Sequence, residues 1–274
     1  MTQRIDRCFE TALKASRKVL IPFITAGDPE PSWTVDLMHA LVAGGADLLE
    51  LGIPFSDPMA DGPVIQASSE RAVGKGVDLV QVLAWVREFR QADRKTPIVL
   101  MGYMNPFERF GYASLARDTA NAGVDGLLLV DCPPEEMPEL QNSLDQHNVY
   151  SIRLVAPTTT TDRLQAITSG AQGFIYYVSF KGTTGASRLD TDALAEPVRK
   201  IRQFSDLPVA VGFGINDAAS ASAVAQISDA IVIGSALVAR LAECKSSEEA
   251  SKCANSFISS VREALDEHEV TIAR

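Results

Sequence analysis

Eight short apolar runs, separated by longer segments with helical periodicity, constrain the fold of this 274-residue chain more than any other feature. The runs are rich in Val, Ile, Leu and aromatic residues, so each is expected to be a strand buried on both faces. Strands that alternate with helices form parallel sheets with helical crossovers. The eight runs lie at residues 19–25, 47–52, 97–102, 126–130, 149–155, 173–178, 208–212 and 230–234.

The intervening segments carry the apolar spacing of helices, as at Leu79, Val82, Leu83 and Val86 and in a continuous stripe over residues 250–265. Eight strand–helix units in about 250 residues predict a (β/α)8 barrel, an α/β fold. No linker or low-complexity stretch interrupts the series, so residues 1–274 are expected to form a single domain. Extra helices are expected before the first strand and in the loops.

A doubly wound sheet is the alternative fold. Such sheets usually carry a glycine-rich fingerprint after the first strand, whereas residues 25–29 here read Thr-Ala-Gly-Asp-Pro. Pro22 removes a hydrogen-bond donor within the first expected strand, which predicts a local bulge there. The barrel therefore remains the favoured fold.

The composition restricts the partners and the chemistry. A net charge of −10 argues against nucleic acid or an anionic membrane as a general partner. Four cysteines form no CxxC pair and three histidines show no zinc-ligand spacing, so no metal site is predicted. Residues 1–17 are charged throughout, without the apolar core of a signal peptide, and reduced thiols in the cytoplasm are expected.

Two carboxyl groups stand out at the second expected strand. Glu50 lies within an apolar run, and Asp61 follows in a loop that Pro54 and Pro58 stiffen. A carboxyl group on a rigid strand facing another on a stiff loop is suited to acid–base catalysis. The alternative is a salt-bridged glutamate at a strand end, followed by a loop of turn-forming residues.

Glycine-bearing loops after the sixth, seventh and eighth strands suggest a phosphate site. In (β/α)8 barrels, function resides in the loops at the carboxyl ends of the strands. Gly214 would let backbone N–H groups approach an anion, and Gly234 and Ser235 precede a helix expected to begin at Ala236. Each glycine alone would indicate a turn, whereas three in neighbouring loops favour an anion site. Residues 180–188 are expected to form a mobile lid.

The stretch 49–62, Leu-Glu-Leu-Gly-Ile-Pro-Phe-Ser-Asp-Pro-Met-Ala-Asp-Gly, closely resembles the signature of the tryptophan synthase alpha subunit family. The resemblance continues over nearly the whole chain. It implies retro-aldol cleavage of indole-3-glycerol phosphate into indole and glyceraldehyde 3-phosphate, without a metal or a cofactor in this chain. It also implies a beta subunit that carries pyridoxal phosphate, in an alpha2beta2 complex. The other resembling blocks are residues 22–29, 101–105, 182–185, 211–215 and 234–236.

The resemblance also implies roles for individual residues. Glu50 would protonate indole C3 and take the proton of the C3′ hydroxyl, while Asp61 would stabilise positive charge on the ring nitrogen. Thr184 would settle the Asp61 loop, and the segments around Pro54 and after Asn105 would contact the beta subunit. The apolar slot for indole is expected to be lined by Phe23, Met101, Leu128, Val130, Tyr176 and Phe213, and the phosphate to be held by Gly185, Gly214, Gly234 and Ser235.

Other functions remain open at this point. The chain could be a free-standing lyase that releases indole, or a silent subunit that only activates a beta partner. The presence of both Glu50 and Asp61 counts against a silent subunit. Without the motif, a phosphosugar isomerase on the same barrel would be the next hypothesis, because a fold alone does not fix function.

Overall fold

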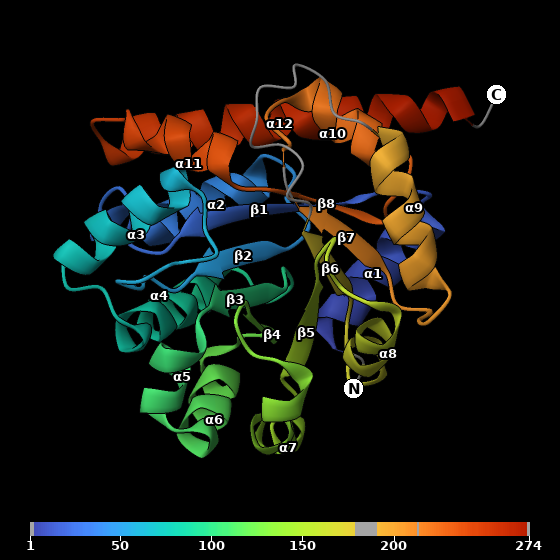
Figure 1. The fold of residues 1–274 in the computed structure, drawn as a ribbon. Coiled ribbons are helices and arrows are strands. Elements are labelled where there is room, and N and C mark those ends of the chain that lie inside the picture. Colours follow the sequence, from blue (N-terminus) through green and yellow to red (C-terminus); the bar gives the residue numbers. More distant parts are fainter. Residues whose placement is uncertain (1–2, 179–190, 213, 273–274) are drawn as a thin grey trace.

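Eight parallel strands close into a barrel in the order β1 to β8 (Figure 1). The structure is a computed structural model, and it describes residues 3–178, 191–212 and 214–272. Each predicted run contains one strand, so the (β/α)8 prediction is confirmed. The strands are β1 Val19–Thr25, β2 Leu49–Gly52, β3 Ile98–Gly102, β4 Gly126–Leu129, β5 Tyr150–Val155, β6 Ile175–Val178, β7 Val209–Gly212 and β8 Ala230–Ile233.

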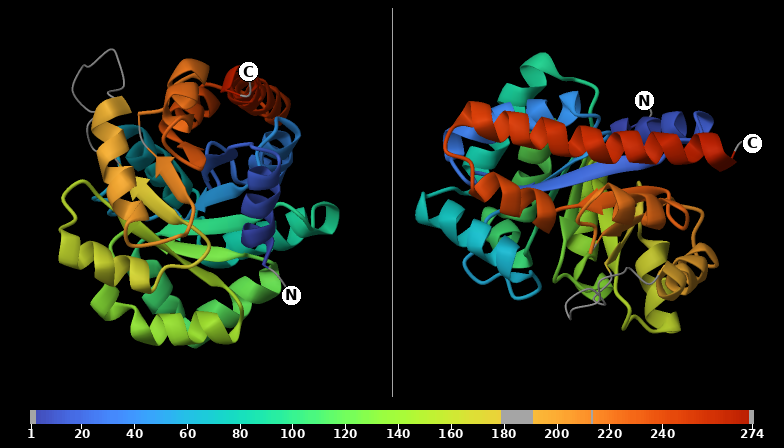
Figure 2. Two further views of the ribbon diagram at one scale, coloured as in Figure 1. Left: turned by 90° about the vertical axis from the view of Figure 1, so that its right-hand side faces the viewer. Right: turned by 90° about the horizontal axis from the view of Figure 1, so that it is seen from above.

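Helices surround the barrel, and the long α12 lies against α2 and α10 on its outside (Figure 2). Additional helices precede β1 and occupy the loops, as expected. No helix of the described part is both long enough and apolar enough to cross a membrane. The helices are α1 Arg4–Lys14, α2 Thr34–Ala43, α3 Pro63–Gly74, α4 Leu79–Ala92, α5 Met104–Phe110, α6 Tyr112–Ala122, α7 Pro138–Gln146, α8 Thr161–Ser169, α9 Thr191–Arg202, α10 Ala218–Ala225, α11 Ser235–Ala242 and α12 Ser247–Ile272, with short 3₁₀ turns at Pro31–Trp33 and Pro134–Glu136.

Along each strand, side chains point alternately into the barrel interior and outward to the surrounding helices. Leu49 and Leu51 of β2 belong to the core between sheet and helices, whereas Leu48 belongs to the core inside the barrel. Glu50 shares the parity of Leu48, so its side chain points inward. Both faces of the strands are thus covered, which explains why they read as continuous apolar runs.

Pro22 does not interrupt β1, so the predicted bulge is wrong. The strand runs unbroken from Val19 to Thr25. Its pairing with β8 ends at Pro22, and its pairing with β2 begins at Phe23. The missing donor therefore falls where the strand changes its pairing partner, and the ladder tolerates it there.

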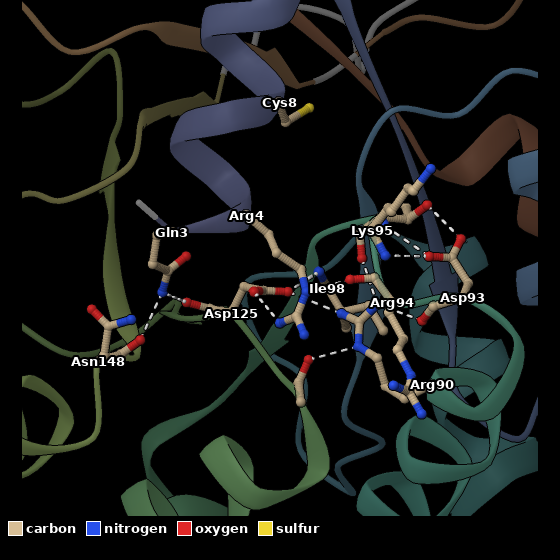
Figure 3. A network of polar contacts seen from close by, with 12 residues as sticks. Gln3, Arg4, Cys8, Arg90, Asp93, Arg94, Lys95, Ile98, Asp125 and Asn148 are labelled. Carbon is tan, nitrogen blue, oxygen red and sulfur yellow. Dashed lines mark hydrogen bonds and ion pairs between the residues drawn. The ribbon is translucent and has the colours of Figure 1, made fainter. Parts of the chain in front are cut away.

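The first helix closes the end of the barrel where the strands begin. Ile5 and Phe9 of α1 pack into the inner core, and the Phe9 ring lies 5.5 Å from that of Phe174. A polar network around Asp125, which is 3% exposed, ties the start of α1 to β3 and β4 (Figure 3). The Asp125 carboxylate accepts hydrogen bonds from Arg4 Nη1 at 2.8 Å, Arg90 Nη2 at 3.0 Å and the Ile98 N–H at 2.9 Å.

Replacing Asp125 by asparagine is expected to destabilise the protein by about 3–5 kcal/mol. The substitution keeps the volume but leaves Arg90, which is 9% exposed, without its buried counter-charge. Urea unfolding followed by circular dichroism measures the loss. Glu248→Gln is the matched control, because the exposed Glu248–Lys252 pair should contribute less than about 1 kcal/mol. Equal losses in the two variants would contradict the role of the Asp125 network.

Candidate active site

Glu50 is a buried carboxyl group in the middle of the barrel wall. It lies level with Phe23 of β1 and Val99 of β3. The residue is 1% exposed, and within the described ranges its Oε2 has no hydrogen-bond partner and its carboxyl group no ion pair. Burial, aided by the nearby charge of Asp61, raises the pKa of Glu50 from 4.5 to about 8. The group is therefore mainly protonated at neutral pH and can act as an acid.

Asp61 is held by a tyrosine that directly follows the neighbouring strand β3. The Tyr103 hydroxyl donates to Asp61 Oδ2 at 3.0 Å and accepts from the Ala60 N–H at 3.0 Å. Gln66 Nε2 donates to the Asp61 carbonyl at 2.8 Å. Burial raises the pKa of Asp61, while the hydrogen bond from Tyr103 opposes that rise. These contacts fix the Asp61 carboxyl group on the loop between β2 and α3.

The two carboxyl groups lie close enough for Asp61 to raise the pKa of Glu50. A salt-bridged glutamate, the alternative considered from the sequence, is not observed in the described part of the chain. A neutral acid beside a second carboxyl group is an arrangement suited to proton transfer.

A cavity of about 290 Å³ opens at the carboxyl ends of the strands. Asp61 lines it, whereas Glu50 is buried behind the lining, level with Phe23. Leu128 is packed within the inner core and does not line the cavity. The apolar wall consists of Phe23, Ile65, Met101, Val130, Leu154, Tyr176, Val178, Ile215 and Val232.

Polar backbone and a helix start form another part of the lining, at Gly214, Asn216, Gly234 and Ser235. The helix α11 begins at Ser235, one residue earlier than predicted, with Gly234 as its N-cap. The first N–H groups of a helix have no intrahelical acceptor and attract anions. Gly214 has φ +70°, a conformation that favours glycine, and a Cβ there would meet no atom within 4 Å. The backbone conformation therefore favours glycine at this position, and the space beside Gly214 is open to a ligand.

Some predicted residues cannot be placed. Thr184, Gly185 and Phe213 lie outside the described residues, as does the expected lid at 180–188. Their assignments stay predictions. The structure brings together Phe23, Asp61, Met101, Tyr176, Gly214, Gly234 and Ser235 around one cavity, above Glu50.

Several lining residues were missed from the sequence. Leu154, Val178 and Val232 occupy the inward parity of their strands, so counting every second residue toward the strand ends would have found them. Asn216 has no such signal, because it lies in the loop after β7, where its side chain donates to the Gly214 carbonyl at 3.3 Å. The hydrogen bond between Tyr103 and Asp61 joins the loops after two different strands. It could not be found from the sequence, because the closed barrel is what brings these loops together.

The raised pKa of Glu50 makes stability depend on pH. Between about pH 4.5 and 8 the unfolded chain releases this proton and the folded protein keeps it, so the free energy of unfolding falls as pH rises. Below pH 4.5 both states are protonated, and above pH 8 both are ionised. Each pKa unit corresponds to about 1.4 kcal/mol.

Glu50→Gln is expected to remove this dependence. The difference in unfolding free energy between wild type and Glu50→Gln should shift by roughly 2–3 kcal/mol in favour of the variant from pH 5.5 to 8.0. Urea titrations at the two pH values measure the shift. A constant difference would show that Glu50 titrates near its usual pKa.

A closed (β/α)8 barrel with two neighbouring carboxyl groups, Glu50 inside the wall and Asp61 in the loop after the same strand, places the chain in the class of barrel enzymes. Comparison with known proteins agrees with the resemblance in the sequence. Residues 9–268 match the family model described as "Tryptophan synthase alpha chain", and the chain belongs to this family.

Relatives share more than half of the sequence. The tryptophan synthase alpha chain of Cupriavidus taiwanensis is 54% identical over 263 residues, which cover 96% of this chain and 99% of the relative. That of Thioalkalivibrio sulfidiphilus is 54% identical over 264 residues, with the same coverage.

Solved structures share the fold. The tryptophan synthase subunit alpha of Legionella pneumophila is 42% identical with a TM-score of 0.91, covering 97% of this chain and 100% of that chain. A chain from Mycobacterium tuberculosis tryptophan synthase in its aminoacrylate-bound form is 32% identical with a TM-score of 0.86, covering 96% of this chain and 100% of that chain.

Proposed function

We propose that this chain is the lyase subunit of a tryptophan synthase, which cleaves indole-3-glycerol phosphate into indole and glyceraldehyde 3-phosphate. The observation that carries the proposal is the buried acid Glu50, with its pKa raised to about 8, beneath an apolar cavity. Membership of the tryptophan synthase alpha chain family supports the same substrate.

The site residues suit a retro-aldol reaction in which Glu50 acts twice. The protonated Glu50 gives its proton to indole C3, which leaves positive charge on the ring nitrogen. Asp61 accepts a hydrogen bond from that N–H and stabilises the charge. The Glu50 carboxylate then removes the proton of the C3′ hydroxyl. The C3–C3′ bond breaks, its electron pair returns to the ring, and an aldehyde forms at C3′ with Glu50 protonated again.

The cavity matches the two halves of the substrate. Apolar side chains such as Phe23, Met101 and Tyr176 would hold the indole ring, and Gly214, Gly234 and Ser235 would hold the phosphate. Among the described residues, the lining of this cavity includes no lysine or arginine. Backbone N–H groups at the start of α11 would bind the dianion, because they are fixed in place and aligned with the helix dipole.

A side chain at Gly214 is therefore expected to weaken substrate binding by roughly tenfold or more, about 1.4 kcal/mol. Valine disfavours φ +70° and would occupy the space that the phosphate needs. Calorimetry in a Glu50→Gln background, which prevents turnover, measures the Kd. Lys181→Ala is the comparison and should weaken binding only modestly. A larger loss in the lysine variant would indicate a cationic clamp.

A beta subunit is the partner that the family membership suggests, with pyridoxal phosphate bound there and an alpha2beta2 assembly. The loop between β2 and α3 supports an interface, because Met59 at its tip is 86% exposed. We also propose that the protein works in the cytoplasm, where thiols stay reduced. The four cysteines, which are free, are consistent with that location. Sedimentation of this chain with and without its beta subunit tests the assembly.

The function is tested by incubating the purified chain with indole-3-glycerol phosphate, with and without the beta subunit. We expect indole and glyceraldehyde 3-phosphate in equal amounts, with a higher rate when the beta subunit is present. An unchanged rate would favour a free-standing lyase. No indole from either sample, with normal stimulation of the beta subunit, would identify a silent activator and contradict the proposal.

A further inference from the structure

A second cavity, of about 360 Å³, lies between β4 and β5. The two strands part after Leu128 and Ile152, whereas β5 continues to pair with β6 as far as Val155. Residues from the split strands, the loop after β4 and α8 line this cavity. Most of the lining is apolar and includes Leu129, Pro133, Met137, Ala156 and Ile167.

Two polar side chains of β5 line this cavity. Ser151 and Arg153 lie two residues apart and therefore share one face of the strand. Ser151 is 1% exposed, and within the described residues its hydroxyl oxygen has no hydrogen-bond partner. A buried hydroxyl group without a partner is costly, so a ligand that supplies an acceptor is favoured here.

Arg153 is a half-buried cation fixed by neutral partners. Its Nη2 donates to Gln141 Oε1 at 2.9 Å, and its Nε donates to the Gly170 carbonyl at 3.4 Å. It forms no ion pair with any carboxylate of the described chain, and burial lowers its pKa. The charge of Asp145 opposes that lowering, and Gln141 links the two residues, since its Nε2 donates to Asp145 at 2.8 Å. The guanidinium group is thus oriented but not neutralised.

We propose that this cavity binds a small organic carboxylate with an apolar body, at a site distinct from the reaction cavity. The Arg153 guanidinium would pair with the carboxylate, and the Ser151 hydroxyl would donate to it. The apolar body would pack against side chains such as Met137 and Ile167. A volume of about 360 Å³ is within the range of small-ligand pockets.

One lining group opposes an anion. The Asp131 carboxylate lines the cavity and accepts a hydrogen bond from the Met104 N–H at 2.7 Å. Arg163, also in the lining, pairs with Glu135 at 3.1 Å in an exposed ion pair. Arg153 and Asp131 should thus affect anion binding in opposite directions.

The test is a titration of the ¹⁵N-labelled wild-type chain with phenylacetate, and with phenylacetamide as the neutral match, followed by amide chemical shifts. Val130 and Leu154 line both cavities and cannot discriminate between them. Binding at the proposed site should shift Cys132, Ser151 and Ile167, and leave Phe23 and Gly234 unchanged. The amide should bind at least tenfold more weakly than the carboxylate.

Variants separate the charge effect from a folding effect. Arg153→Met should weaken phenylacetate binding at least tenfold, Asp131→Asn should strengthen it, and the surface variant Arg117→Met should leave it unchanged. If Arg153→Met does not fold, the amide comparison and Asp131→Asn decide. Shifts confined to the reaction cavity, equal binding of the amide, or no gain in Asp131→Asn would overturn the proposal.

Discussion

Replacing Glu50 by glutamine is expected to reduce indole formation from indole-3-glycerol phosphate by roughly 10²–10⁴-fold or more. Glutamine keeps the size and fits the same buried position, but it can neither donate the proton to indole C3 nor accept that of the C3′ hydroxyl. Glu50 is assigned both transfers, so the loss should appear in kcat rather than in KM.

The comparison needs evidence that the variant folds. Circular dichroism should be unchanged, and by the linkage argument above the variant should be more stable relative to wild type at pH 8.0 than at pH 5.5. Glu263→Gln, an exposed change on α12, is the matched control and should retain full activity. A folded Glu50→Gln protein within tenfold of wild type would transfer the acid–base role to another group.

Replacing Asp61 by asparagine is expected to lower kcat by roughly 10²-fold or more. The amide oxygen can still accept the hydrogen bond from Tyr103, so the loop should keep its position. It carries no negative charge, however, and cannot balance the positive charge that develops on the ring nitrogen. Initial rates of the isolated chain measure the loss.

Asp57→Asn is the matched control within the same loop. Asp57 is exposed. Its carboxylate accepts a hydrogen bond from the Ser56 hydroxyl, and within the described residues no group of the cavity donates to it. Its replacement should leave the rate of the isolated chain nearly unchanged. A greater loss in Asp57→Asn than in Asp61→Asn would show that the wrong carboxyl group of the loop has been assigned.

The barrel could be predicted because its signals are local. Each strand is a short apolar run covered on both faces, and Leu79, Val82, Leu83 and Val86 mark one face of α4, where all four are buried. Glu50 was identifiable because an ionisable residue in such a run is unusual. Its inward direction followed only from the strand parity that the structure established.

Features that depend on closure of the barrel could not be predicted. The effect of Pro22 depends on which neighbour β1 pairs with at that residue, and the sequence does not contain that information. The bond from Tyr103 to Asp61 joins the loops after two different strands. The start of α11 differed by one residue because Gly234 caps the helix through its backbone, without a side chain to mark the boundary.

The protonation state of Glu50 is the central claim, and ¹³C NMR of a protein labelled at glutamate carboxyl carbons tests it most directly. The Glu50 resonance is assigned as the one missing from Glu50→Gln. We predict that this signal titrates with a midpoint near pH 8, so that the acid is protonated at neutral pH. A midpoint at or below about pH 5, near the unperturbed value for glutamate, would contradict the account.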